Sequence, residues 1–295
     1  SYNTLGAISM QGVRQADLRL GESCVVIGLG LLGQLACLIL KASGVNVIGV
    51  DISDAAVNLA IKNGAVDHGF SRNTGGIEDK ISNATGGIGA DAVIIAAATS
   101  SLDPVNFAGA VARKKGKVVV LGAVPTGFDR DPYYYRKELE LKMACSYGPG
   151  RYDLDYEEKG QDYPVAYVRW TEKRNMEAFQ QLLNTKRINI EYLTTHEFSF
   201  EDAPKAFDLV VNKTEPFIGL ALKYNIENEQ LKQPVQTNSS KPTGKINISF
   251  IGAGSYAQGN LLPNLTETKD VQRIGVLTNT GTTSKRVAEK FKFEF

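Results

Sequence analysis

The residues with the clearest chemical meaning lie in a glycine-rich stretch near the start of the chain. Gly28, Gly30 and Gly33 follow an apolar, β-rich run and open an apolar helical run. This G-x-G-x-x-G spacing at a strand-to-helix turn is typical of dinucleotide-binding folds. The first glycine permits the tight turn, the second leaves room for a pyrophosphate, and the third lets helix and strand pack closely. Backbone N–H groups at the helix start, around Leu31 and Leu32, would then bind the phosphates.

An acidic residue, Asp51, closes the next apolar strand, at about the 20-residue spacing from Gly28 where an acid binds the adenosine ribose hydroxyls. A carboxylate there would repel a 2′-phosphate, and residues 52–56 contain no Arg or Lys to offset the charge. The sequence therefore predicts NAD rather than NADP, with Ile52 as a neighbouring contact. The alternative is that Asp51 only caps the next helix.

Composition limits the other classes of function. The 295 residues are 43% hydrophobic and 22% charged, which is ordinary for a globular protein of about two domains. A net charge of +1 gives no basic surface for nucleic acid or an anionic membrane, so neither is expected as a partner. Residues 23–40 are uncharged, but glycines interrupt them, and a nucleotide fold explains them better than a membrane span. There is no signal-peptide pattern, so we expect a cytoplasmic protein.

Cysteine and histidine offer little for metal or redox chemistry. Cys24, Cys37 and Cys145 form no close pair and fall on apolar faces of predicted elements, so we expect reduced, buried thiols. The two histidines, His68 and His196, have no Cys, Asp or Glu at a convincing metal-ligand spacing. The sequence predicts no metal site and no zinc, and it assigns no catalytic residue.

Strand-like and helix-like segments alternate through residues 1–146, which predicts an α/β fold with a Rossmann doubly wound parallel sheet. The predicted strands are Cys24 to Ile27, a second ending at Asp51, a short third near His68, Ala92 to Ala97 and Lys117 to Leu121. The predicted helices are Leu5 to Ala16, Leu31 to Ser43, one capped by Ser53 and ending near Asn63, Ile77 to Ala84, and one opened by Pro104.

With these segments in place, residues 4 to about 224 resemble the medium-chain dehydrogenase/reductase family, the zinc-type alcohol dehydrogenase group. The resemblance rests on the GLGLLG turn with its acid, NGAVDH, TGGIGADAVIIAAA and GKVVVLGAV. It implies that Gly122, Ala123 and Val124 line the nicotinamide. Ala97 would face the same crevice, since ligands bind at strand carboxyl ends. The alternative for these small residues is ordinary turn chemistry.

The resemblance also implies that residues 147–224 are the returning segment of a catalytic domain. This segment is rich in Tyr and Arg, and Tyr147, Arg151 and Tyr152 are its candidate substrate contacts. The alternatives are a rigid loop packed by its own aromatics and a subunit contact. Family members carry their metal ligands in a β-rich domain before the nucleotide fold, whereas this sequence begins at Ser1, so we expect a fragment.

A polar stretch, 225–244, is predicted as a linker. Residues 245–295 then resemble the start of the glucose-fructose oxidoreductase and inositol dehydrogenase family, through a G-x-G-x-x-A turn formed by Gly252, Gly254 and Ala257. The next strand ends at Thr278 rather than an acid, so NAD, NADP or no cofactor remain open at this second, incomplete Rossmann site.

Two interpretations of function follow. The first is an NAD-dependent oxidoreductase module that moves a hydride to or from an alcohol or sugar-like carbonyl, as part of a larger two-domain enzyme and not competent alone. The second is a dinucleotide-binding module without catalysis in this chain. A small-molecule substrate is the expected partner, and a homodimer is left open.

Overall fold

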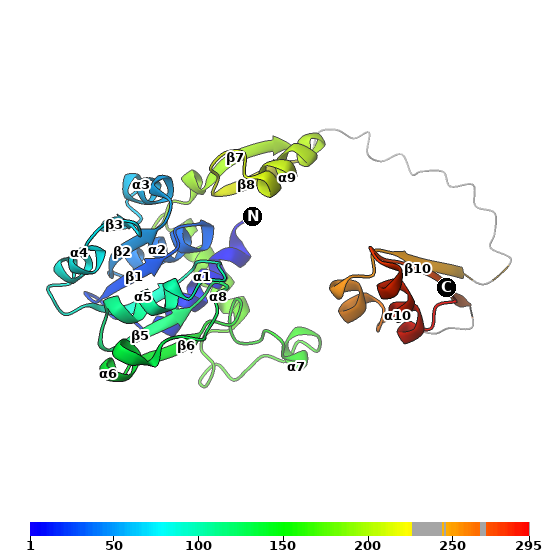
Figure 1. Ribbon diagram of the computed structural model, residues 1–295, viewed down its shortest axis with the longest axis horizontal. Coiled ribbons are helices and arrows are strands. Elements are labelled where there is room, and N and C mark those ends of the chain that lie inside the picture. The colour runs from blue at the N-terminus through cyan, green and yellow to red at the C-terminus, as the bar shows by residue number, and fades with distance from the viewer. Residues whose placement is uncertain (226–243, 245, 266–269, 295) are drawn as a thin grey trace. The chain divides into compact units, whose positions relative to one another are not determined.

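The protein is described here by a computed structural model that covers residues 1–225, 244, 246–265 and 270–294. Its internal contacts divide the chain into two compact units, Ser1–Asn225 and Ile226–Phe295 (Figure 1). The boundary falls at the first residue of the predicted linker, and nearly all of that linker lies outside the described residues. The finer division of the first unit at residue 146 stays a prediction.

The first unit is built on a six-stranded sheet with the order β3-β2-β1-β4-β5-β6, and every pairing in it is parallel. This confirms the Rossmann doubly wound sheet. Its strands are β1 (Ser23–Ile27), β2 (Asn46–Asp51), β3 (His68–Ser71), β4 (Ala90–Ile95), β5 (Ala112–Val120) and β6 (Glu140–Met143). Its helices are α1 (Asn3–Ala16), α2 (Leu31–Ala42), α3 (Asp54–Lys62), α4 (Ile77–Ala84), α5 (Asp103–Val111) and the short α6 (Tyr135–Lys137), which follows the π-helix η1 (Arg130–Tyr134).

Helices cover both faces of this sheet, which explains the unbroken apolar run of its central strand. Cys24 and Val26 of β1 join the core beneath α1, α2 and α3, whereas Val25 and Ile27 join the core beneath α4 and α5. All five residues of β1 are buried. A strand buried on both faces has no solvent side and therefore loses the apolar-polar alternation of a surface strand.

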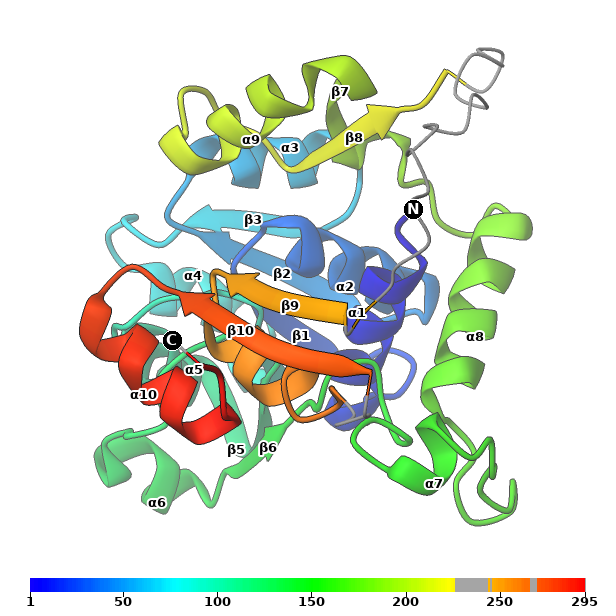
Figure 2. The same ribbon diagram turned by 90° about the vertical axis from the view of Figure 1, so that its right-hand side faces the viewer.

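The rest of the first unit packs in two places. It comprises α7 (Leu154–Glu157), α8 (Glu172–Asn184), η2 (Glu191–Leu193), β7 (Thr194–Ser199), η3 (Phe200–Asp202), α9 (Ala203–Asn212) and β8 (Gly219–Lys223). Helix α8 packs on α1, and the segment from β7 to β8 lies on the α3 side of the sheet (Figure 2). Phe179 of α8 is fully buried against α1, and Asn175 accepts a hydrogen bond from Arg14 Nε at 2.8 Å. β7 and β8 form a separate parallel pair, and with α9 they lie on the α3 side of the sheet (Figure 2).

One prediction about the cysteines is wrong. Cys24 and Cys37 are buried as expected, and burial raises the pKa of both thiols, but Cys145 is exposed. The strand before it, β6, ends at Met143, so Cys145 lies beyond the sheet. β6 is also the last strand of the sheet, and among the described residues only one of its edges is paired.

The second unit contains β9 (Ile246–Ile251), the π-helix η5 (Ala257–Leu261), β10 (Val271–Leu277) and α10 (Gly281–Phe291). β9 and β10 pair in parallel. Its small hydrophobic core includes the buried residues Ala253, Leu262, Val276, Val287 and Phe293. This is the strand, glycine turn, helix and strand order that the sequence predicts.

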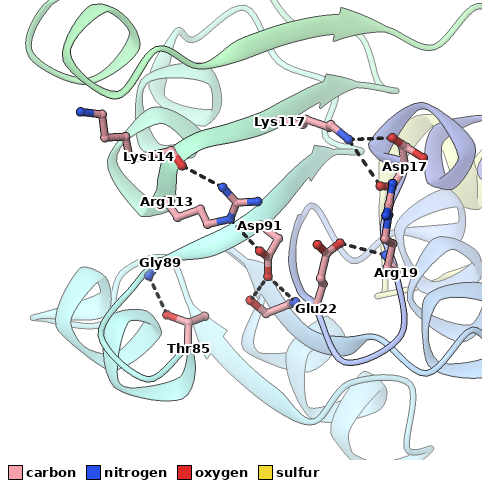
Figure 3. Close-up of polar contacts among 10 residues, drawn as sticks. Asp17, Arg19, Glu22, Thr85, Gly89, Asp91, Arg113, Lys114 and Lys117 are labelled. Carbon is pink, nitrogen blue, oxygen red and sulfur yellow. Dashed lines mark hydrogen bonds and ion pairs between the residues drawn. The ribbon is translucent and has the colours of Figure 1, made fainter.

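A polar network joins three strands at the amino-terminal edge of the large sheet (Figure 3). Asp91 of β4 accepts hydrogen bonds from the Ser23 N–H at 2.8 Å and from Arg113 Nε at 2.6 Å. Nearby, Lys117 of β5 pairs with Asp17 at 2.9 Å. Burial would raise the pKa of Asp91, but the hydrogen bonds from Ser23 and Arg113 outweigh it and hold the pKa below its ordinary value. The carboxylate thereby fixes the start of β1 against β4 and β5.

We expect D91N to lower the free energy of unfolding at pH 7 by about 1.5–3 kcal/mol, the usual contribution of hydrogen bonds to a charged group. Because the native pKa is lowered, this stabilisation is present above the ordinary pKa of an aspartate and disappears as the pH falls through the native value. The difference between D91N and the unmodified protein should therefore shrink on acidification. Urea unfolding at pH 7 and at an acidic pH below the native pKa of Asp91 checks this. The control is D155N, which removes a carboxylate from an exposed pair with Lys159. An unchanged difference at low pH would contradict it.

Candidate dinucleotide-binding site

The turn between β1 and α2 brings backbone segments into close contact. Gly28 has φ of +93°, a left-handed conformation that side chains disfavour, and a Cβ there would lie 2.7 Å from Ala97 N. A Cβ at Gly33 would lie 1.8 Å from the Gly28 carbonyl oxygen. Both positions therefore require glycine if α2 is to pack on the ends of β1 and β4.

Gly30 differs from its neighbours because it faces open space. A Cβ built there meets nothing within 4 Å, and no side chain caps the start of α2. Leu31 and Leu32, the first helical residues, are half-buried and leave their N–H groups at this open end. A helix N-terminus with free N–H groups and positive dipole suits a diphosphate.

Asp51, the last residue of β2, is held by the backbone on both sides. Its Oδ2 accepts a hydrogen bond from Leu29 N at 2.6 Å, and its Oδ1 accepts one from Ser53 N at 2.8 Å. The cap of α3 is Ser53, whose hydroxyl accepts from Ala56 N at 3.3 Å. Asp51 is thus not the cap of α3, and each carboxylate oxygen keeps a lone pair for further hydrogen bonds.

Two cavities, of about 410 and about 660 Å³, share Gly30 and Asp51 in their walls. The smaller one lies at the carboxyl ends of β1, β2 and β4, the edge at which parallel sheets bind ligands. It includes Gly28 and Ala97 and the exposed side chain of Ile52. The larger one lies between the start of α3 and the segment 213–218.

The residues that the family resemblance places at the nicotinamide lie beside the smaller cavity. A Cβ at Gly122 would lie 2.1 Å from the Ala97 carbonyl oxygen, so the loops after β4 and β5 touch. The Thr99 N–H donates to the Ala123 carbonyl at 3.0 Å, and Val124 packs on the core beneath α4 and α5. Gly122 to Val124 line neither of the two cavities, so their contact with a nicotinamide stays a prediction.

Sequence reasoning missed a cation in the smaller cavity. Arg72 follows β3 and lines that cavity together with Asp51 and Asp103. Residues 52–56, which follow Asp51 in the chain, contain no Arg or Lys and so give no sign of this charge. A neighbouring parallel strand could have supplied the signal, because the register pairs Asp51 with Ser71 and brings the next residue to the same edge.

The candidate substrate contacts form a cluster of their own, away from both cavities. Arg151 pairs with Glu157 at 2.5 Å and lies 4.4 Å from the ring centroid of Tyr152 and 5.7 Å from that of Tyr147. Burial, and then the charge of Glu157, raises the pKa of Glu172 beside them. This packing fits the alternative of a loop held by its own aromatics, and the substrate role stays a prediction.

Metal chemistry finds no support in the part of the chain that the structure describes. Within those residues no three His, Cys, Asp or Glu side chains are grouped so that they could hold a metal ion. His68 is exposed at the start of β3, and His196 faces Glu215 at 3.4 Å. The expected absence of zinc stays a prediction. In the same residues, no helix combines the length and apolarity that crossing a membrane requires.

The second glycine turn has a similar local geometry. Gly252 has φ of +88° and donates its N–H to the Leu277 carbonyl at 2.8 Å. A Cβ at Gly254 would meet nothing within 4 Å, and Ala257 is buried at the start of η5. Nothing else in the structure tests cofactor binding at this turn.

Comparison with known proteins bears on the first unit. Residues 32–158 match the family model described as zinc-binding dehydrogenase. The chain is 30% identical over 209 residues to D-guloside 3-dehydrogenase of Escherichia coli, covering 68% of this chain and 53% of that protein. It is 28% identical over 210 residues to probable D-xylulose reductase A of Aspergillus niger, covering 69% and 51%. The chain thus spans about half the length of the curated relatives it matches.

The fold agrees with these sequence matches. The structure superimposes on an alcohol dehydrogenase of Thermus sp. ATN1 with a TM-score of 0.58 and 18% identity, covering 76% of this chain and 58% of that one. The medium-chain dehydrogenase part of the resemblance is therefore confirmed, with residues 32–158 as its matched core. The resemblance of residues 245–295 to the glucose-fructose oxidoreductase family stays a prediction.

The contrast between two glycines gives a test of the site. We expect G30A to keep the free energy of unfolding within about 1 kcal/mol, because its methyl group enters open space, but to weaken NAD binding at least about tenfold. G33A should instead lower the free energy of unfolding by about 1–3 kcal/mol, because its Cβ collides with the Gly28 carbonyl. Urea unfolding and calorimetric titration of both variants check this. Tight NAD binding by G30A would show that no pyrophosphate lies over Gly30.

Proposed function

We propose that the first unit binds NAD and serves as the cofactor module of an oxidoreductase that acts on an alcohol or a sugar-like carbonyl. The observation that carries the proposal is the position of Asp51 in the walls of both cavities, together with the open backbone at Gly30. A ribose on the carboxylate and a diphosphate at the start of α2 fit the same cavity edge.

The chain's own residues would bind and orient the cofactor. The Leu29 N–H fixes one carboxylate oxygen of Asp51 and so aims the other lone pairs toward the ribose hydroxyls. The buried ends of β1 and β4 would exclude water from one side of the dinucleotide. When bound, the nicotinamide supplies the hydride chemistry, and the protein supplies its orientation.

The substrate class is proposed from the relatives. A guloside dehydrogenase and a xylulose reductase are among the proteins that this chain matches, and both names denote oxidation or reduction of sugars. We extend this class, and a small-molecule substrate, to the present protein. A cytoplasmic location and a homodimer also remain proposals.

A second candidate function, dinucleotide binding without catalysis in this chain, is favoured by the lining of the smaller cavity. Its ionisable residues are Asp51, Arg72 and Asp103, and each already makes hydrogen bonds within the protein. Among the residues that the structure describes, no His, Lys, Tyr or Cys lines that cavity to transfer a proton to or from a substrate. We therefore expect the chain alone to bind NAD and to reduce it only at background rate with alcohols or sugars. Rapid NADH formation, followed at 340 nm, would exclude the binding-only function.

The preference for NAD is tested at Asp51. We expect D51N to weaken NAD binding about 10- to 100-fold, since charge-assisted hydrogen bonds to the ribose are lost, and to leave NADP binding nearly unchanged, since the lost hydrogen bond to the ribose is offset by the lost repulsion of the 2′-phosphate. Calorimetric titration with both cofactors measures this. The matched control is D54N, which removes an exposed carboxylate of α3 that lines neither cavity. Equal affinities of the unmodified protein for NAD and NADP would refute the role of Asp51.

A further inference from the structure

Arg72 stands next to the acid that selects the cofactor. Ser71 pairs with Asp51 in the parallel register of β2 and β3, and the Arg72 N–H donates to the Asp51 carbonyl at 2.8 Å. The Arg72 side chain lines the cavity of about 410 Å³, and no other Arg or Lys does so among the described residues. A positive charge therefore lies at the edge where a ribose 2′-phosphate would sit.

This cation is held by a partner from another part of the fold. Arg72 Nε donates to Asp103 Oδ2 at 3.1 Å, and Arg72 Nη2 donates to Asp103 Oδ1 at 2.8 Å. The guanidinium also lies 4.1 Å from the ring centroid of Phe107, on the same helix α5 as Asp103. Two parallel hydrogen bonds and a stacked ring fix the plane of the guanidinium, which a single ion pair would not do.

We propose that Asp103 is a specificity-determining residue, which favours NAD over NADP by keeping Arg72 from binding a ribose 2′-phosphate. The inference rests on the proposed function, because it presupposes that NAD occupies this cavity. A 2′-phosphate brings about two negative charges toward Asp51. It would need a free guanidinium, the group best matched to a phosphate, to offset that repulsion. With Nε and Nη2 on Asp103, the charge of the guanidinium is offset by a carboxylate, and the edge that would bind a phosphate through two parallel hydrogen bonds is turned toward α5.

Asp103 is suited to this role by its place in the fold. It is the first residue of α5, where an acidic side chain interacts favourably with the helix dipole. Its side chain is 52% exposed, whereas that of Arg72 is 26% exposed. The pair therefore sits at the mouth of the cavity rather than in the core. Loss of the Asp103 carboxylate should change the charge that a ligand meets in the cavity without disrupting the sheet.

Another cation must be separated from Arg72 in any test. Lys213 lines the larger cavity, which also includes Asp51, and it is exposed. A gain in NADP affinity could thus come from either side chain. Only a double substitution distinguishes them.

The experiment measures the affinities of NAD and NADP by calorimetry for the unmodified protein, D103N, R72A and R72A/D103N. We expect D103N to tighten NADP binding about tenfold and to change NAD binding less than about threefold. R72A alone should leave the NADP affinity near that of the unmodified protein, and the double variant should lose the gain. D103S repeats the release of Arg72 with a residue that suits the start of a helix. E138Q, which removes the exposed pair with Lys115, is the control.

The outcomes separate the inference from the proposed function. NAD binding with the same NADP-to-NAD ratio in D103N and D103S overturns the inference and leaves the proposed function standing. A gain that persists in R72A/D103N also overturns it, since the cation is then Lys213 or another group. Failure of the unmodified protein to bind either cofactor overturns the proposed function, and the inference with it.

Discussion

The hydrogen bond from the Leu29 N–H to the Asp51 carboxylate joins the two parts on which the candidate site depends. It connects the glycine turn after β1 to the end of β2, at 2.6 Å. The Gly28 N–H also donates to the Val50 carbonyl at 2.8 Å, so two successive residues of the turn are held to β2. Asp51 also lines both cavities, so the same interaction orients the carboxylate on which the proposed ribose contact depends.

Around this contact, three glycines within six positions meet different physical requirements. Gly28 is needed for its left-handed backbone, Gly33 for the space next to a carbonyl oxygen, and Gly30 for neither reason. Packing inside the protein explains two of them. Gly30 is the N-cap of α2, a position that glycine suits, and its open face is where the proposed pyrophosphate would lie.

The sequence predicted the sheet and the glycine turn well because both depend on local pattern. The apolar run of β1 and the spacing of the three glycines specify a buried parallel strand and its turn whatever the distant residues do. The position of Arg72 could not be found in this way, since its meeting with Asp103 depends on strand order rather than chain order. Cys145 was misplaced for a related reason, because an edge strand such as β6 can stop early without leaving a buried face uncovered.

The two cavities differ in the span of sequence that supplies their lining residues. The smaller one is made from residues 27–104, whereas the larger one adds Thr195 and residues 213–218 to the region around Gly30 and Asp51. A ligand that fills both would act as a non-covalent cross-link between the β7, β8 and α9 layer and the main sheet. By mass action, its binding free energy would then be added to the stability of segments far apart in sequence. The return of the chain past α3 would thus make the cofactor a structural part of the fold as well as a reactant.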